Sequence, residues 1–421
     1  MEQRLELLPG VCLTAVQTDK FKTGCFSINF LRPMCREEAS GNALIPSVLL
    51  RGSERYPDIP SISARLDELY GASMGTLVRK KGEVQLVGFF ADFIEDALAG
   101  EPVFEPMLEF VAEILLHPLT KDDYFVPELV EGEKRNLCNA IAARINDKRS
   151  YASSQLIKLM CPDEPYGVPR LGELEDVQRV DAQRLYAHYR KVLAESQAEL
   201  FYMGRKDPQD VAACLKKVLA ALPRAQAFAQ VCTLQGAAAE TPREVRAHLD
   251  VTQGKLAIGL RTGCTVRDDG YPALLMLNAI YGGGVTSKLF QNVREQMSLC
   301  YYAGSSIEKF KGVMVVSAGV EFDQYQKARD EILRQLELCR KGEITDDEFD
   351  AARRYILSEL KLAKDSPGRL DDFYMGQAVA GLSGTMDDLA GRIARVTKQD
   401  VADAACRLQL DTIYFLEGQT A

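Results

Sequence analysis

The sequence predicts an α+β protein built from two similar domains, and three observations support this prediction. The chain has 421 residues, which is roughly twice the length of one typical domain. Stretches with a strand-like pattern alternate with stretches of helical periodicity. Residue patterns of the first half recur in the same order in the second half, as expected for a duplicated domain.

The first half contains the elements of one mixed domain. Apolar residues alternate or run together between glycines and charged turns, which predicts strands at 25–31, 84–90 and 199–203. Elsewhere apolar residues recur three and four positions apart, which predicts helices at 62–70, 95–115, 126–144, 182–193 and 211–222. We therefore place the first domain at residues 1–224.

A linker and an internal repeat define the second domain. Residues 225–241 are rich in Ala, Gln and Gly without a clear period, so we expect a linker there and the second domain at 242–421. The segment from Leu31 to Cys35 recurs as the segment from Leu260 to Cys264, each time after a strand-like run. Lys81-Gly82 recurs as Lys311-Gly312 at nearly the same separation. Two matches at one separation favour duplication of an α+β domain over coincidence.

Composition excludes several classes of protein. The 51 basic and 60 acidic side chains give a formal charge of -9, which disfavours binding to nucleic acid. No signal peptide and no apolar run long enough to span a bilayer is present, so we expect a soluble cytoplasmic protein without a membrane partner. The 11 cysteines are scattered without close pairs, which favours reduced thiols over a disulfide framework or a zinc cluster.

Several short motifs are specific enough to indicate a family. In the first domain they lie at residues 41–43, 49–53, 66–72, 133–134 and 165–167. In the second domain a glycine triplet at 282–284 precedes Ser287 and Leu289-Phe290, and then Arg294-Glu295 and Leu299-Cys300-Tyr301 follow in fixed order. These segments resemble the processing-peptidase branch of the pitrilysin/insulinase superfamily of zinc peptidases. The overall pattern is similar to a non-peptidase bacterial member linked with modification of elongation factor P.

The resemblance implies an architecture and a metal site. In this family each half is a mostly antiparallel sheet with helices on one face, and the two halves form a clamshell. Active members bind zinc through a His-x-x-Glu-His motif and a later carboxylate. Aligned through Gly41 and Gly52, the motif positions are Leu44, Ser47 and Val48, and the later ligand position is Ala140. Because Leu, Val and Ala have no lone pair for a cation, we expect no metal and no cofactor in this chain.

The three histidines offer no replacement for the lost ligands. His117 precedes Pro118 at a predicted helix end, where we expect its side chain to cap the last carbonyl groups. His188 lies between Tyr186 and Tyr189 on a predicted helix, which favours partly buried packing. His248 lies at the start of a predicted strand, where a solvated side chain is expected.

The resemblance also assigns two side chains of the second domain to substrate binding. Arg294 and Tyr301 match an Arg and a Tyr that close over the substrate in active members, where the phenol can donate a hydrogen bond to an oxyanion. Alternatively, Arg294 pairs with Glu295 or another acid, and Tyr301 is part of a hydrophobic strand. Ser298 replaces the usual glycine of this turn, which leaves the direction of the tyrosine open.

The glycine triplet Gly282, Gly283 and Gly284 has two possible roles. Glycines permit a close approach of two backbone segments, or they lie beside a sheet edge that receives an extended peptide by strand addition. The triplet is not a phosphate-binding loop, because the terminal Lys-Ser or Lys-Thr of that motif is absent.

Three functional hypotheses follow. The first is a non-peptidase subunit that pairs with a zinc-bearing homologous peptidase, contributing Arg294 and Tyr301 to the binding of an extended peptide, with a homodimer as the alternative assembly. The second is a scaffold or peptide-holding protein with no role in proteolysis. The third is an enzyme with Cys300 as nucleophile, although no histidine lies near Cys300 in the sequence to activate it.

Overall fold

The computed structural model describes residues 2–418 and divides them into two compact units. The first unit comprises the chain up to Ala142, Val168–Cys232 and Pro367–Val379. The second comprises Ala143–Gly167, Thr233–Ser366 and the chain from Ala380 onward. Each unit thus contains one segment that lies in the other half of the sequence. Residues 225–241 form neither helix nor strand.

The first unit is built on a six-stranded sheet in the order β1-β2-β8-β3-β5-β4. Only β2 and β8 pair in parallel, and the other neighbours are antiparallel. The central strand β3 pairs Ile28 with Leu200 of β8 and with Phe89 of β5. The strands are β1 (Glu2–Leu8), β2 (Val11–Gln17), β3 (Thr23–Pro33), β4 (Ser73–Lys81), β5 (Val84–Ile94) and β8 (Gln197–Gly204).

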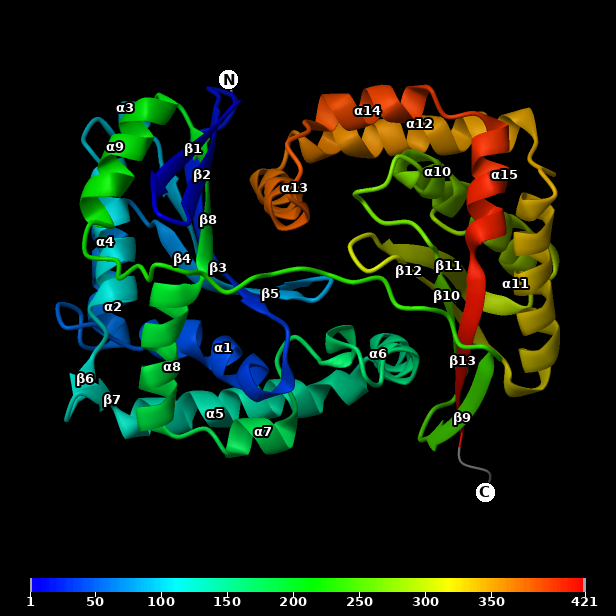
Figure 1. The fold of residues 1–421 in the computed structure, drawn as a ribbon, viewed down its shortest axis with the longest axis horizontal. Helices are drawn as coiled ribbons and strands as arrows, with labels where there is room; N and C mark the ends of the chain where they lie inside the picture. The colour runs from blue at the N-terminus through cyan, green and yellow to red at the C-terminus, as the bar shows by residue number, and fades with distance from the viewer. Residues whose placement is uncertain (1, 419–421) are drawn as a thin grey trace. The chain divides into compact units, whose positions relative to one another are not determined.

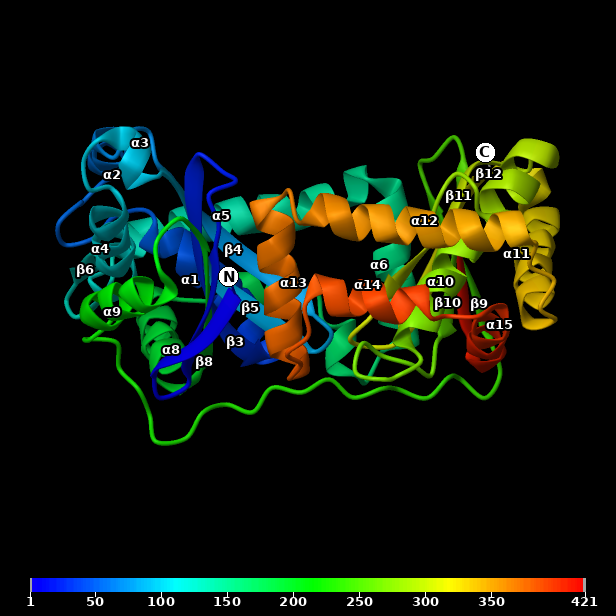
Figure 2. The ribbon, with the colours of Figure 1, turned by 90° about the horizontal axis from the view of Figure 1, so that it is seen from above.

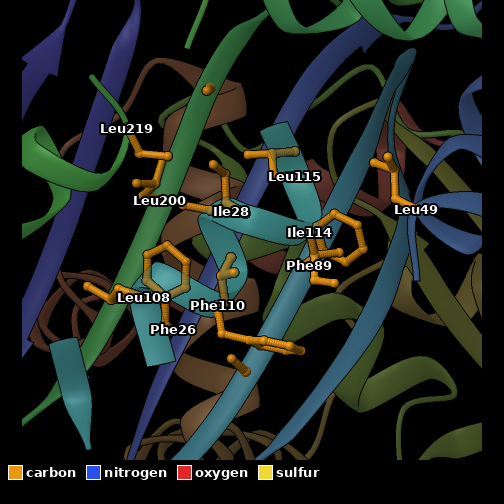
Figure 3. Close-up of a cluster of buried hydrophobic side chains, with 14 of the residues drawn as sticks. Phe26, Ile28, Leu49, Phe89, Leu108, Phe110, Ile114, Leu115, Leu200 and Leu219 are labelled. Atoms are coloured by element: carbon orange, nitrogen blue, oxygen red, sulfur yellow. The ribbon is translucent and has the colours of Figure 1, made fainter. Parts of the chain in front are cut away.

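Most helices of the first unit cover one face of this sheet. Figure 3 shows Ile28, Phe89 and Leu200 of the sheet meeting Ile114 and Leu115 of α4 in a hydrophobic core. Burial of each such side chain contributes about 1.5–3 kcal/mol. The helices are α1 (Arg36–Leu49), α2 (Ile59–Glu68), α3 (Asp96–Ala99), α4 (Phe104–Leu116), α5 (Pro127–Ala142), α7 (Leu174–Gln178), α8 (Ala182–Glu195), α9 (Pro208–Val218) and α13 (Pro367–Ala380), with a short ribbon of β6 (Thr120–Lys121) and β7 (Tyr124–Phe125).

The second unit repeats the strand order of the first. Its five-stranded sheet has the order β9-β13-β10-β12-β11, which matches β2-β8-β3-β5-β4, and its one parallel pair, β9 with β13, matches β2 with β8. The strands are β9 (Arg243–Leu249), β10 (Gly254–Arg261), β11 (Cys300–Glu308), β12 (Val313–Val320) and β13 (Gln409–Gly418). The predicted α+β class with two homologous domains is therefore confirmed.

Helices of the second unit form its core with one face of the sheet. Tyr281, Ile332 and Phe415 are among its fully buried side chains. The helices are η1 (Ala143–Asn146), α6 (Lys148–Met160), η2 (Pro165–Gly167), α10 (Tyr271–Tyr281), the π-helix η3 (Leu289–Gln296), η4 (Phe322–Gln324), α11 (Tyr325–Arg340), α12 (Asp346–Ala363), α14 (Met386–Ala394) and α15 (Lys398–Arg407). Within residues 2–418 no helix combines the length and apolar character needed to cross a lipid bilayer.

The opposite face of each sheet receives one helix from the other half of the sequence (Figures 1 and 2). In the second unit, Leu156 and Met160 of α6 pack against Ala257 of β10 and Tyr414 of β13. In the first unit, Tyr374 of α13 stacks on Phe201 of β8 with ring centroids 5.9 Å apart. The prediction of helices on one face thus holds for most helices, with α6 and α13 as additions on the second face.

The lysines of the two repeated Lys-Gly pairs have matching roles. Each contacts the segment that the other half of the sequence contributes to its unit. Lys81 is 5% exposed, and its Nζ lies 2.6 Å from Oδ1 of Asp372 on α13. Lys311 is 1% exposed, and its Nζ lies 2.5 Å from Oε2 of Glu164, which follows α6. A buried ammonium group is costly unless a carboxylate lies beside it. Each lysine therefore binds an acid that the other half of the sequence supplies.

A substitution on α13 tests whether this helix stabilises the first unit, to which it packs from the second half of the sequence. The buried carboxylate of Asp371 accepts a hydrogen bond of 2.6 Å from Ser27 Oγ and forms an ion pair with Arg79. Asp371→Ala leaves both groups without this partner, so we expect the free energy of unfolding to fall by about 2–3 kcal/mol. Asp350→Ala removes an exposed carboxylate from α12 and is expected to change it by less than about 0.5 kcal/mol. If denaturant titrations show the same loss in the free energy of unfolding for Asp371→Ala and Asp350→Ala, Asp371 does not have the stabilising role described.

Candidate functional site

The residues at the zinc-motif positions lie on two adjacent helices of the first unit. Leu44 and Val48 of α1 are 1% and 3% exposed and belong to the hydrophobic core, while Ser47 is half-buried. Ala140 is exposed on α5, which packs against α1. A zinc ion requires nitrogen, sulfur or oxygen donors. The aliphatic side chains of Leu44, Val48 and Ala140 have none, and the first two are buried in the core.

The acid that remains near these positions is already paired. Glu133 of α5 is 7% exposed, forms an ion pair with Arg51, and accepts a hydrogen bond of 3.1 Å from Asn136 Nδ2. Sequence reasoning missed the part played by Arg51, although its place directly before Gly52 could have suggested a partner for Glu133. Within residues 2–418 no group of three or more His, Cys, Asp or Glu side chains is arranged to hold a metal ion.

The histidines have different surroundings from one another. His117 is the residue that ends α4, but its Nδ1 lies 4.0 Å from Glu54 Oε2, and only its backbone N–H bonds to the helix, at Glu113. The expectation that the His117 side chain caps the helix is wrong, because this side chain turns toward an acid instead. His188 is half-buried on α8, as the sequence indicated. His248 is exposed as expected, but it lies near the end of β9 and not at the start of the strand.

The side chains of Arg294 and Tyr301 follow one another along the chain but differ in their contacts. Arg294 lies on η3, with its guanidinium 4.5 Å from the centre of the Phe290 ring and its Nε 3.6 Å from Glu295 Oε1. Tyr301 on β11 is 64% exposed. A hydrogen bond from its phenol to Glu321 raises the pKa of Tyr301. The phenol therefore stays protonated at neutral pH and retains a hydrogen to donate.

A backbone irregularity directs Tyr301 outward. The pairing of β11 with β12 shifts between Cys300 and Tyr302, which leaves Tyr301 as the extra residue of a bulge. Ser298, three residues earlier, has φ 51°, the left-handed conformation that glycine adopts without strain. The backbone at Ser298 thus has a conformation typical of glycine although serine occupies the position.

The neighbouring Tyr302 lies in a different environment. The Arg149 guanidinium of α6 lies 4.4 Å from the centre of its ring. Its hydroxyl is buried with no hydrogen-bond partner among the described residues, and burial raises the pKa of Tyr302 to about 12. Of the two neighbouring tyrosines, Tyr301 is thus the exposed one, and Tyr302 has the buried hydroxyl.

The first glycine of the triplet, Gly282, packs against the edge strand β11. The carbonyl of Gly282 accepts a hydrogen bond of 2.9 Å from the backbone N–H of Ser305. A Cβ on Gly282 would lie 2.6 Å from that nitrogen, and one on Gly283 would lie 2.9 Å from Ala279 Cα. Gly284 has open space, with Tyr355 as its nearest neighbour at 4.0 Å. At Ser305 the edge of β11 is therefore bonded within the chain, which supports the packing role for Gly282 and Gly283.

Cys300 has the surroundings of an unreactive thiol. It is 8% exposed, and burial raises its pKa to about 11, with Arg294 acting in the opposite direction. A thiol with this pKa is almost entirely protonated at neutral pH, whereas nucleophilic attack requires the thiolate. The structure gives no support to the hypothesis of a cysteine enzyme.

The strained turn before β11 generates a prediction about stability. Ser298→Gly relieves the cost of a positive φ, although the more flexible unfolded chain offsets part of the gain. We expect the free energy of unfolding to rise by up to about 1 kcal/mol. A matched change at an exposed serine of regular helix, Ser358→Gly on α12, should lower it by a similar amount. If denaturant titrations show that Ser298→Gly lowers the free energy of unfolding, the claim that the positive φ of Ser298 is strained is wrong.

Comparisons with known proteins agree with the fold. Residues 179–356 match the family model described as the peptidase M16 inactive domain. The chain is 34% identical over 411 residues to the probable inactive metalloprotease YmfF of Bacillus subtilis, covering 97% of this chain and 96% of that protein. It is also 27% identical over 288 residues to an uncharacterized zinc protease of Streptomyces coelicolor, covering 66% and 62%.

A solved structure extends the similarity over the whole fold. The crystal structure of a conserved protein from Enterococcus faecalis has a TM-score of 0.91 with this chain at 30% identity, and it covers 100% of this chain and 99% of that one. The similarity to YmfF extends over nearly all of both chains and identifies the family. The residues at the zinc-motif positions do not suit zinc; they are Leu44, Ser47, Val48 and Ala140. The chain belongs to the M16, or pitrilysin/insulinase, peptidase family as an inactive member that lacks the residues of the zinc site.

Proposed function

We propose that this chain is the non-peptidase subunit of a heterodimer with a zinc-bearing homologue, to which it contributes Arg294 and Tyr301 for the binding of an extended peptide. The observation that carries the proposal is the exposed phenol of Tyr301 on a bulge behind a strained turn. Strain of this kind persists at sites where a side chain must be held in one direction.

The chemistry of Tyr301 suits a donor to a developing oxyanion. Its phenol is protonated and is bonded to Glu321 in the free chain. A bound peptide must displace this bond before the hydroxyl can donate to the scissile carbonyl oxygen. A donor of this type stabilises the charge that appears in the transition state, and the loss of one such donor typically costs about 100- to 1000-fold in rate.

Arg294 suits a role in holding the peptide. Its side chain is 39% exposed, and its Nε lies 3.6 Å from Glu295, which is longer than a hydrogen bond. The ring of Phe290 supports one face of the guanidinium, which leaves N–H groups available to peptide carbonyls. The expected effect of Arg294 is therefore on peptide affinity.

The similarities also support a partner of the same fold. A relative whose name states that it is a zinc protease aligns with 66% of this chain, which supports a zinc-bearing partner of similar sequence. A zinc-bearing chain would supply the metal and the general base, and this chain would supply only Arg294 and Tyr301.

Mixing the chain with its zinc-bearing homologue tests the proposal. With a quenched fluorescent peptide as substrate, Tyr301→Phe should lower kcat by at least about tenfold, because it removes one transition-state donor. Arg294→Ala should mainly raise KM. Tyr70→Phe is the matched control, because the Tyr70 phenol donates to Glu101 at 2.6 Å and is 50% exposed in the other unit. Arg354→Ala, at an exposed position of α12, is the control for Arg294.

The alternative outcomes separate the hypotheses. If the homologue cleaves the peptide equally well with wild-type chain and both variants, Arg294 and Tyr301 have no part in proteolysis. Co-purification of an intact peptide with this chain in the absence of a zinc-bearing homologue would favour the peptide-holding protein instead.

A further inference from the structure

A pocket in the first unit combines positive charge with a neutral imidazole. It has a volume of about 350 Å³ and lies between the first half of α1, the end of α7 and the first half of α8. Arg36, Arg179 and Arg184 line it together with His188. The pocket contains none of the zinc-motif positions and neither Arg294 nor Tyr301. Local sequence patterns did not reveal it, because its residues come from three separate helices.

A chain of hydrogen bonds fixes the tautomer of His188. Gln85 Nε2 donates to the carbonyls of Ala39 and Arg170, at 3.0 and 2.7 Å, so the Gln85 oxygen is free to accept. It accepts from Asn42 Nδ2 at 2.9 Å, and this leaves the Asn42 oxygen 2.7 Å from His188 Nε2. The hydrogen of the imidazole must therefore lie on Nε2, and Nδ1 carries a lone pair.

The imidazole keeps this lone pair at neutral pH. Burial lowers the pKa of His188 to about 4, with Arg32 and Lys191 acting in the same direction and Glu38 opposing them. No described residue donates a hydrogen bond to Nδ1 of His188. His188, a residue of the pocket lining, thus carries an acceptor atom that receives no hydrogen bond from the described residues.

Carboxylates beside the pocket orient the three arginines without using all their donors. Arg36 Nε lies 2.8 Å from Asp176, Arg179 lies 3.5 Å from the same acid, and Arg184 lies 3.2 Å from Asp181. Each guanidinium has five N–H donors in a planar fork that matches a carboxylate. Glu37 and Asp176 are the acids of the lining, and Asp181 beside it pairs with Arg184, so three carboxylates lie close to the three guanidinium groups.

We propose that this pocket binds the carboxyl terminus of a peptide or an N-acylated amino acid. The arginines bind the α-carboxylate, the backbone N–H donates to Nδ1 of His188, and the side chain packs against Val180 and Leu185 of the lining. An α-amide N–H lies next to its own carboxylate, so one terminal residue can satisfy both features. The carboxylates beside the arginines disfavour a dianion such as inorganic phosphate, and the apolar wall favours an organic monoanion.

Nitrogen-15 spectra of the imidazoles test this site, because the chain contains only three histidines. N-acetyl-leucine should move the Nδ1 resonance of His188, assigned with a His188→Gln variant, and the shift should saturate in the millimolar range or below. N-acetyl-leucinamide keeps the N–H but lacks the carboxylate, so its binding should be at least tenfold weaker. Arg184→Ala should weaken the binding of N-acetyl-leucine at least fivefold.

The controls separate this site from general charge effects and from the proposed peptidase partnership. Arg190→Ala removes an exposed arginine of the same helix outside the pocket and should leave the binding of N-acetyl-leucine unchanged. Equal binding of the amide, an equal effect of Arg190→Ala, or no shift of His188 would overturn the proposal. A tighter response to inorganic phosphate would overturn the assignment to a carboxyl terminus. Arg294→Ala and Tyr301→Phe should not affect this binding.

Discussion

A buried ammonium group needs a carboxylate beside it, and in this protein the other half of the chain supplies that carboxylate in both units. Lys81 binds Asp372 of α13, and Lys311 binds Glu164 beyond α6. Neither sheet has its second face covered without a helix that is distant in sequence. Such long-range contacts carry a large loop-closure cost, so folding of one unit depends on residues of both halves.

The positions on α1 that match the zinc motif of the family carry no zinc ligands in this chain. Leu44 and Val48 fill the hydrophobic core at positions where the zinc motif requires two imidazoles. The remaining acid, Glu133, forms an ion pair with Arg51. The positions that would hold a metal are therefore used for packing and for an internal ion pair. The second unit holds Arg294 on a π-helix and Tyr301 at a bulge, and neither feature depends on a metal ion. This contrast is the reason why we propose a role for the chain beside a zinc-bearing homologue.

The sequence predicted the duplication because the repeated residues are structural ones. Arg32 and Arg261 are 3% and 4% exposed, and the repeated lysines are equally buried, so the charged positions recur with the fold. The exchange of α6 and α13 was not predictable, because helical periodicity does not tell which sheet a helix will cover. The packing of α13 depends on pairs such as Ser27 with Asp371, which are far apart in the sequence.

Site residues were predictable only where they form a local motif. The positions of Leu44, Ser47, Val48 and Ala140 follow from alignment, and the turn at Ser298 was recognised as unusual from one replaced glycine. Its positive φ depends on the backbone, which the residue type alone does not determine. The hydrogen bonds that fix the His188 tautomer involve Asn42 and Gln85 from other elements, so no local pattern indicated this pocket.

Metal analysis of the purified chain, produced without its homologue, tests the central claim most directly. The account predicts far less than one zinc per chain by mass spectrometry of elements, no peptide hydrolysis, and an unfolding temperature that a chelator does not change. Stoichiometric zinc, together with hydrolysis that a chelator abolishes and zinc restores, would contradict it.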